Sequence, residues 1–279
     1  MNKLDLGRRA FVAACASAPL LLNAKGRIPV GLELYSVREE LKKDLPETLK
    51  TVAGDGYQCA EFFASYHDWT VEYAQGVRKQ LDQLKLRCYS THNALRYLAP
   101  DQIEKTIELN RALGARFVIV ASAGDPKTLD GWKGVAEKLS EASKKLAGHK
   151  LHVGYHNHET EFTPLDGTRP IEVLARNTPH DVTLQLDVGT CVKAGSDPVA
   201  WIKQNPGRIR SMHCKDWSPQ NGYKVLLGEG VAPWKKIFAA AESVGGVEYY
   251  LIEQEGSRYS EFETAKLCFS AFQKLHRGA

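Results

Sequence analysis

The feature that most constrains this chain is a regular alternation of short β-type segments with longer helical ones. Eight short segments rich in apolar and β-branched residues follow one another from residue 28 onward: 28–34, 58–62, 86–90, 116–121, 151–155, 182–186, 209–212 and 249–252. Between them, apolar residues recur at helical spacings of three and four in the segments 38–53, 69–84, 99–113 and 128–146. Strands separated by helices predict right-handed crossovers and a parallel sheet.

Eight such units close naturally into a (β/α)₈ barrel, the TIM barrel, which takes roughly 250 residues. The chain has 279 residues, so one barrel accounts for its length without a second domain. An open, doubly wound sheet is the alternative, but it would carry a glycine-rich phosphate loop after an early strand, and Val30-Gly31-Leu32 is no such loop. We therefore expect a single-domain α/β fold.

The first 24 residues have the pattern of an export signal. The pair Arg8-Arg9 precedes an apolar run that ends near Leu22, which resembles a signal for the twin-arginine (Tat) pathway. This run is shorter than the ~20 residues that a membrane-spanning helix needs, and no later stretch of that length lacks charges. The sequence thus predicts a signal peptide at 1–24, a barrel domain at 25–279, and a mature periplasmic protein without an integral membrane segment.

Charge and cysteine content exclude several classes of function. The formal net charge is +4, and half of it lies in the leader, where three basic residues oppose Asp5. A body near +2 is too weakly basic to indicate a nucleic-acid partner. The six cysteines form no C-x-x-C pair, which argues against a disulfide framework and against a thiolate zinc site. A small molecule is the expected partner, and homo-oligomerisation stays open.

Ionisable side chains gather where the predicted strands end. In chain order these ends carry Glu33, Glu61, His92, Ser122, His156-Asn157-His158, Asp187, His213 with Lys215 and Asp216, and Glu253 with Gln254 and Glu255. In a parallel barrel the carboxyl ends of the strands form one mouth, and active sites lie there. The opposite ends begin with ordinary solvent-facing residues such as Lys150 and Arg208.

The last four strand ends predict a metal site. His156, Asp187, His213 and Glu253 each offer one nitrogen or oxygen ligand toward the common mouth. Each alone is more often structural, but four on adjacent strands favour one shared divalent ion. Imidazole with carboxylate suits a transition metal better than Ca²⁺, with Mn²⁺ as the first candidate and Zn²⁺, Co²⁺, Fe²⁺ or Mg²⁺ open. His158 is two residues from His156 on the same side, so either histidine could be the ligand.

Six short motifs in this sequence resemble those of the sugar phosphate isomerase/epimerase, or xylose isomerase-like TIM barrel, superfamily. They are Gly31–Arg38 (GLELYSVR), Tyr155–Phe162 (YHNHETEF), Leu186–Gly189 (LDVG), His213–Asp216 (HCKD), Leu227–Gly230 (LGEG) and Glu253–Glu255 (EQE). The resemblance extends from Ile28 to the C-terminus. It implies that Asp187, His213 and Glu253 match ligand positions of the family's metal site.

The chain departs from the family pattern at His156. Ketose 3-epimerases and inosose dehydratases of this superfamily carry a glutamate there, and in the epimerases that glutamate exchanges a proton with the one matching Glu253. A metal-bound neutral imidazole has no free lone pair for this work, so the resemblance does not extend to the two-glutamate mechanism. Endonuclease IV relatives use several zinc ions and a basic DNA-facing surface, which this body lacks.

The expected function is a metal-dependent enzyme of the isomerase/epimerase type that removes a proton next to the carbonyl of a keto-sugar. The candidate bases are Glu253, His158 and Lys215, with an electrostatic role, or a simple pair with Asp216, as the alternatives for Lys215. The predicted sugar contacts are Glu33, His92, Glu61, Asp216 and Trp217. Two other functions stay open: a lyase or hydratase acting on 3-keto-glycosides, and a non-enzymatic exported sugar-binding barrel with a structural metal.

Overall fold

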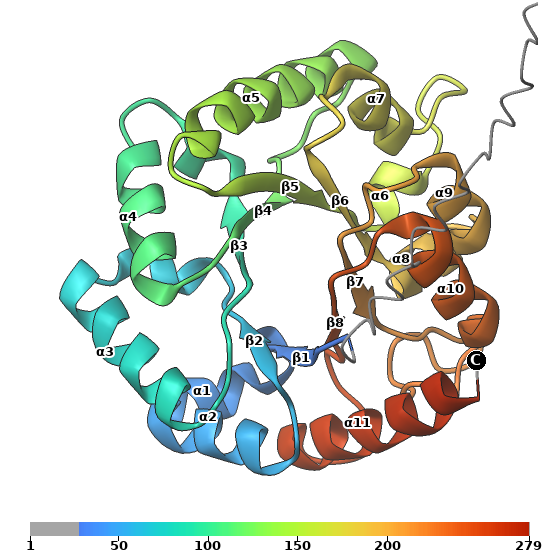
Figure 1. Cartoon of the computed structure of the whole chain (residues 1–279). Coiled ribbons are helices and arrows are strands. Elements are labelled where there is room, and N and C mark those ends of the chain that lie inside the picture. Colours follow the sequence, from blue (N-terminus) through green and yellow to red (C-terminus); the bar gives the residue numbers. More distant parts are fainter. Residues whose placement is uncertain (1–27, 279) are drawn as a thin grey trace, which may run out of the picture.

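The computed structural model describes residues 28–278, which form a ring of eight parallel strands surrounded by helices (Figure 1). The strands are β1 Val30–Glu33, β2 Cys59–Glu61, β3 Ser90–Ala94, β4 Phe117–Ser122, β5 His152–His156, β6 Thr183–Asp187, β7 Ser211–Cys214 and β8 Tyr249–Ile252. Hydrogen bonding joins them in the order β2-β1-β8-β7-β6-β5-β4-β3. The predicted single-domain TIM barrel is confirmed.

The outer layer consists of helices that connect successive strands. They are α1 Arg38–Lys43, α2 Leu45–Gly54, α3 Val71–Gln83, α4 Ile103–Leu113, α5 Leu129–Ala147, α6 Glu159–Phe162, α7 Pro170–Asn177, α8 Val188–Lys193, α9 Pro198–Gln204, α10 Trp234–Ala240 and α11 Glu261–Arg277. Shorter helical turns are η1 Leu34–Val37, η2 Ala64–Asp68, η3 Leu95–Leu98 and η4 Ala241–Gly245. The predicted leader at 1–24 lies outside the described residues. Between residues 28 and 278, no helix is both long and apolar enough to cross a membrane.

The ring closes between β2 and the segment before β3. Ala60 N–H donates to the carbonyl of Arg87, and Arg87 N–H donates to the carbonyl of Gln58. Isolated bridges pair Cys59 with Arg87 and Phe62 with Thr91. These bonds satisfy backbone groups that an open sheet edge would leave unpaired, so the barrel presents a continuous rim.

One predicted strand is displaced. The apolar run 86–90 predicted the third strand, whereas the ladder with β4 begins at Ser90 and continues to Ala94. The sequence of β3 is Ser-Thr-His-Asn-Ala, and all five residues are buried. Because the strand lines the polar centre of the barrel, it lacks the apolar pattern by which strands are recognised. His92 therefore lies within β3 and not after it.

One predicted helix is divided. The segment 38–53 forms α1 and α2 with a break at Asp44, whose carboxylate accepts a hydrogen bond from Glu47 N–H at 2.9 Å and caps α2. Pro46 follows two residues later and lacks an N–H for a continuous helix. The cap and the proline together restart the helix.

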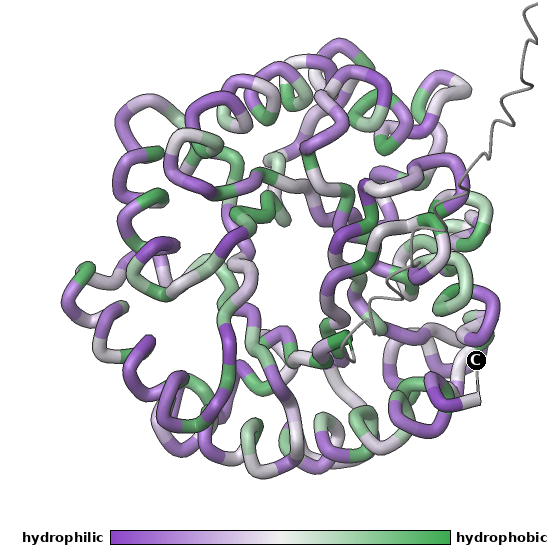
Figure 2. Tube along the Cα trace, viewed as in Figure 1, coloured by the Kyte–Doolittle hydropathy of each residue, from purple (hydrophilic) through white to green (hydrophobic). Residues whose placement is uncertain are grey.

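Two apolar regions hold the barrel together. The larger one lies between the strands and the helices, which turn their apolar residues inward and their hydrophilic residues outward (Figure 2). A smaller cluster of Cys59, Phe117, Ile119, Tyr249 and Leu251 fills the interior of the barrel. On β2, Cys59 is followed two residues later by Glu61, and on β8 Leu251 is followed by Glu253. Alternation along each strand thus places ionisable groups above an apolar floor.

Candidate metal centre

Four buried side chains from neighbouring strand ends meet at the mouth of the barrel. His156 ends β5, Asp187 ends β6, His213 lies in β7, and Glu253 follows β8. Each offers one ligand atom, and these four atoms all lie within 4.8 Å of one another. His156 Nε2 is 3.9 Å from Asp187 Oδ2, and His213 Nδ1 is 2.6 Å from Glu253 Oε2. This spacing allows the four atoms to share one ion.

The state of Asp187 tests whether the cluster suits a cation. Its Oδ1 accepts a hydrogen bond from Thr190 N–H at 2.9 Å, which caps α8 and fixes the carboxylate. Its Oδ2 is buried and has no hydrogen-bond partner among residues 28–278. Burial raises the pKa of Asp187, while the charge of Lys215 opposes that rise. A buried acceptor without a donor is costly, and a bound cation would satisfy it.

His156 is oriented as a ligand. Its Nδ1 lies 3.0 Å from Oε1 of Gln185, which can only accept, so Nδ1 carries the proton and donates. The lone pair of Nε2 then faces the cluster. Burial, followed by the charges of His213 and His92, holds the pKa of His156 well below its ordinary value. A neutral imidazole with a fixed tautomer is the form that binds metal ions.

His213 lies between two carboxylates. Its Nε2 is 2.8 Å from Glu61 Oε2, on the side away from the cluster, and its Nδ1 faces Glu253. Burial acts to lower the pKa of His213, but its hydrogen bonds with Glu253 and Glu61 raise it to about 10. If Nε2–H donates to Glu61, the lone pair of Nδ1 points at another acceptor, and a proton or a metal ion must lie between them.

Lys215 is a buried cation beside the cluster. Its Nζ lies 3.3 Å from Glu253 Oε1 and 3.7 Å from Asp187 Oδ2, and it also pairs with Glu255. Burial acts to lower the pKa of Lys215, but Glu253, Asp187 and Glu255 raise it well above its ordinary value. Lys215 does not pair with Asp216, which was one alternative that the sequence left open. The raised pKa keeps Lys215 protonated, which argues against its action as a neutral base.

A cavity of about 350 Å³ opens above these groups. Glu253 and His156 form part of its floor, and Glu33, His92 and His158 form part of its wall. This volume lies at the lower end of the range for small-ligand sites, ~300–1,000 Å³. The cavity therefore suits a compact ligand of about the size of a monosaccharide.

Glu33 is a neutral carboxylic acid in this wall. Burial is the main cause that raises its pKa to about 8, because it outweighs the opposing charge of His92; Glu253 and Glu61 add to the rise. Its Oε2 accepts from Tyr35 N–H, while its buried Oε1 has no hydrogen-bond partner within the described part of the chain. Oε1 is thus available to a ligand in the cavity.

Comparison with known proteins agrees with this architecture. Residues 49–267 match the family model described as "Xylose isomerase-like TIM barrel". The chain belongs to this family. Among curated proteins, it is 26% identical over 189 residues to an inosose dehydratase of Lacticaseibacillus casei, a match that covers 55% of this chain and 63% of that protein. The chain therefore covers less than two thirds of the length of this relative.

Solved structures of the family share the fold. A sugar phosphate isomerase/epimerase from Parabacteroides distasonis superposes with a TM-score of 0.76 at 24% identity, over 90% of this chain and 97% of that one. The IolI protein, whose structure holds a zinc atom, superposes with a TM-score of 0.69 at 15% identity, over 90% of this chain and 98% of that one. At these identities the likeness concerns the fold.

The sequence left open whether His156 or His158 is the metal ligand, and the two side chains lie in different places in the structure. His156 belongs to the cluster of four. His158 lines the same cavity but is exposed, and its ring lies 5.0 Å from that of His156. A second set, His92 with His156 and His213, also brings three ligand atoms within the same limit. In that set His92 Nε2 already faces Gln185 Oε1 at 2.8 Å and Glu61 Oε2 at 3.0 Å.

Three residues predicted to contact the sugar do not line the cavity: Glu61, Asp216 and Trp217. Glu61 lies beneath it, where it faces His213, His92 and Gln185. Burial acts to raise the pKa of Glu61, but His92 and His213 hold it far below its ordinary value.

Asp216 is occupied by the loop that follows β7. Its two carboxylate oxygens accept from the backbone N–H groups of Trp217, Gly228, Gly230 and Ala232, and from Trp234 Nε1. Trp217 belongs to the same loop, and its carbonyl accepts from Val231 N–H. These donors use the lone pairs of Asp216 that a sugar would need, so its role is to hold the loop.

Sequence reasoning missed Gln185, which connects the site from below. Its Oε1 faces His92 and His156, while its Nε2 donates to Glu61 at 3.1 Å and to Ser211 Oγ at 3.0 Å. Gln185 precedes Asp187 by two residues on β6, so strand alternation places both side chains inside the barrel. An amide carries no charge, so a pattern of ionisable ligands does not include Gln185.

Proposed function

We propose that this chain is a divalent-metal-dependent enzyme that removes a proton from the carbon next to the ketone of a keto-sugar and then eliminates a substituent from the following carbon. The observation that carries the proposal is the cluster of His156, Asp187, His213 and Glu253 beneath a sugar-sized cavity. Two imidazole nitrogens with two carboxylate oxygens suit Mn²⁺, Zn²⁺, Fe²⁺ or Co²⁺. Bound there, such an ion would polarise the ketone and stabilise the enolate.

The first step needs a base in the cavity and a charge partner beside it. The C–H bond next to the ketone breaks, the proton goes to Glu253 or His158, and the electron pair forms the enolate. Lys215, cationic and 3.3 Å from Glu253, stabilises the developing oxyanion electrostatically. His92 and Glu33 hold sugar hydroxyls from the wall.

Elimination follows from the groups that remain. The enolate reforms the ketone as the new C=C bond forms, the bond from the next carbon to oxygen breaks, and the leaving oxygen takes a proton from Glu33. In a 3-keto-glycoside the leaving group is the aglycone alcohol at C1, and in a cyclic keto-polyol it is water. An acid, Glu33, and a separate base, Glu253 or His158, are the two groups that this order of proton transfers requires. A neutral His156 in place of a second glutamate disfavours symmetrical epimerisation.

The inosose dehydratases among the curated relatives, by their name, carry out an elimination. The alternative is isomerisation or epimerisation, the activity for which the similar Parabacteroides protein is named. Both outcomes share the first step, so the product distinguishes them. An unsaturated sugar with a released alcohol or water supports elimination, whereas a saturated isomer supports the alternative.

The test combines metal content with solvent exchange. Wild type should hold close to one equivalent of metal by elemental analysis and, in D₂O, incorporate deuterium next to the ketone of 3-keto-glucosides. Asp187→Asn should lose the metal because it halves the charge of the carboxylate pair, while circular dichroism stays unchanged. Stoichiometric metal in Asp187→Asn would contradict the ligand assignment. Ligand binding without exchange or product would instead favour a sugar-binding barrel.

We also propose that residues 1–24 direct export through the Tat pathway to the periplasm, leaving the barrel domain at 25–279. The support is the Arg8-Arg9 pair before the apolar run. Export would favour an unphosphorylated substrate, since phosphosugars are mainly cytoplasmic. Cell fractionation should find the wild type in the periplasm and the Arg8→Lys/Arg9→Lys double variant inside the cell. Equal periplasmic amounts of both would refute the signal.

A further inference from the structure

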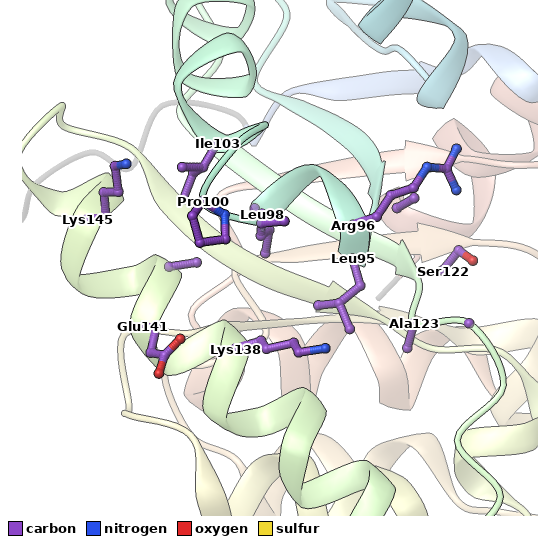
Figure 3. Close-up of a pocket in the computed structure, with 14 residues that line it drawn as sticks. Leu95, Arg96, Leu98, Pro100, Ile103, Ser122, Ala123, Lys138, Glu141 and Lys145 are labelled. Atoms are coloured by element: carbon purple, nitrogen blue, oxygen red, sulfur yellow. The ribbon is translucent and has the colours of Figure 1, made fainter.

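A second cavity opens beside the mouth of the barrel, between η3, the start of α4, and α5 (Figure 3). Its volume is about 560 Å³, within the ~300–1,000 Å³ range of small-molecule sites. Its walls are mainly apolar, with Leu95, Leu98, Pro100, Ile103 and Ala142 among them. Apolar walls of this kind suit a flat hydrophobic group rather than a second sugar.

The two cavities share a low ridge. Ala94 and Ser122, which end β3 and β4, line both of them and are partners in the strand register. On each strand, the residue before this position lines the cavity of the metal centre and the residue after it lines the second cavity. Alanine and serine extend little beyond Cβ, so one ligand can reach from the first cavity into the second.

Two of the cations that line this second cavity have no carboxylate partner among the described residues. Arg96 and Lys138 line it, and neither forms an ion pair with another residue between 28 and 278. Lys145 is already paired with Glu104 at 2.7 Å. Glu141, one turn after Lys138 on α5, also lines the cavity. The cavity therefore offers two cations, Arg96 and Lys138, to an anionic group on a ligand.

We infer that this second cavity is an aglycone subsite, which binds an aromatic ring with an acidic substituent while the attached keto-sugar occupies the cavity above the metal centre. The inference rests on the proposed function and names its class of substrate: 3-keto-glycosides of aromatic acids. The apolar walls bury the ring, and Lys138 and Arg96 attract its carboxylate. Cleavage at C1 releases the hydroxyaromatic acid within this cavity.

The experiment compares three 3-keto-β-glucosides that differ only in the aglycone: methyl, phenyl and 4-carboxyphenyl. For the wild type we expect kcat/KM for the phenyl compound to exceed that for the methyl compound by at least about tenfold, and the 4-carboxyphenyl compound to gain a further severalfold, mainly through KM. The methyl compound serves as an internal control because it cannot occupy the subsite.

Two variants and a matched control locate the effect. Lys138→Glu should lower kcat/KM for the 4-carboxyphenyl compound about tenfold and leave the methyl compound unchanged. Ala123→Phe, which fills the cavity, should bring both aryl compounds down to the level of the methyl compound. Lys144→Glu makes the same charge change on α5 at an exposed position away from the cavity, and it should change none of the three.

The outcomes separate the subsite from the proposed function. If the wild type cleaves all three compounds equally, the subsite is wrong and the proposed function stands. If it cleaves none, the proposed function fails, and the subsite is decided by NMR titration with 4-hydroxybenzoate, the aglycone itself. Binding that Lys138→Glu abolishes and Lys144→Glu retains supports the subsite, whereas absent binding, or binding equal in both variants, overturns it.

Discussion

The two halves of the barrel mouth differ sharply in charge and in space. The half formed by β5 to β8 carries the buried cluster of His156, Asp187, His213 and Glu253, with Lys215 beside it. On the other half, β1 and β3 present Glu33 and His92 to the cavity, and β3 and β4 end in Ala94 and Ser122. At the mouth, the first half carries charges that need compensation, while the second presents a neutral acid above the ionised Glu61 and leaves room for a ligand.

This difference indicates a division of labour. Charges buried at low dielectric interact strongly, so the β5–β8 half can fix a cation and an enolate. Small side chains on the β1–β4 half lower the wall toward the second cavity. Under the proposed function, metal binding and enolate stabilisation fall to the β5–β8 half, whereas the acid Glu33 and the selection of the aglycone fall to the β1–β4 half, so variants on each side should behave differently.

The largest effect is expected for Lys215→Met. Removing this cation leaves the buried carboxylates of Glu253 and Asp187 without their shared partner. We expect a loss of about 3–5 kcal/mol in the free energy of unfolding of the chelated protein, measured by urea denaturation. Saturating Mn²⁺ should recover part of this loss, because a bound cation replaces some of the missing positive charge.

Lys193→Met is the control for that measurement. Lys193 pairs with Glu159 at 2.7 Å, but both side chains are more than a third exposed. A surface pair of this kind contributes ~1 kcal/mol or less. If Lys215→Met is no more destabilising than Lys193→Met, the β5–β8 half is not the tightly coupled electrostatic unit described above.

A smaller effect is expected for Glu61→Gln, beneath the cluster. Glu61 Oε2 lies 2.8 Å from His213 Nε2 and fixes which nitrogen faces the cluster. Glutamine keeps the shape but removes the charge, so metal affinity should fall roughly 10- to 100-fold. Isothermal titration with Mn²⁺ measures this. Glu248→Gln, at the opposite end of the barrel beside Arg210, should leave the affinity unchanged. An unaltered affinity in Glu61→Gln would mean that Glu61 does not orient His213 toward the metal.

Much of the fold could be predicted because strands buried on both faces form apolar runs. The runs at 116–121 and 182–186 coincide closely with β4 and β6. β3 escaped this reasoning because its buried residues are polar, and their partners come from other strands and helices: Thr91 bonds to Asn110, and His92 faces Glu61. Burial of polar groups depends on partners distant in the sequence, which a local pattern does not contain.

The same limit applies to the site. Strand ends placed His156, Asp187, His213 and Glu253 at one mouth because a closed barrel has only one such rim. Beyond the strand end, alternation no longer fixes where a side chain points. Lys215 turns to the cluster, whereas its neighbour Asp216 turns to the loop that returns at Gly228 and Trp234. The loop donates hydrogen bonds to Asp216 from residues 12 to 18 positions later in the chain. No local sequence pattern around Asp216 indicates these bonds.

A pH-dependent effect is expected on the β1–β4 half, from the neutral acid Glu33. Its pKa in the folded protein is about 8, against an ordinary value of 4.5. The folded protein therefore keeps a proton that the unfolded chain releases above pH 4.5. Its contribution to stability is complete below pH 4.5 and is lost as the pH rises to about 8. Glu33→Gln cannot titrate and keeps a similar shape.

We therefore expect wild type to lose stability relative to Glu33→Gln as the pH rises from 5 to 8, by at least about 1.4 kcal/mol, a tenfold change in the folding equilibrium. Urea unfolding of both chelated proteins at intervals of one pH unit measures this difference. Above pH 8 the two curves should run parallel, because Glu33 is then ionised in both states. A constant difference from pH 5 to 9 would mean that Glu33 is an ordinary solvated carboxylate and cannot supply the proton for the leaving group.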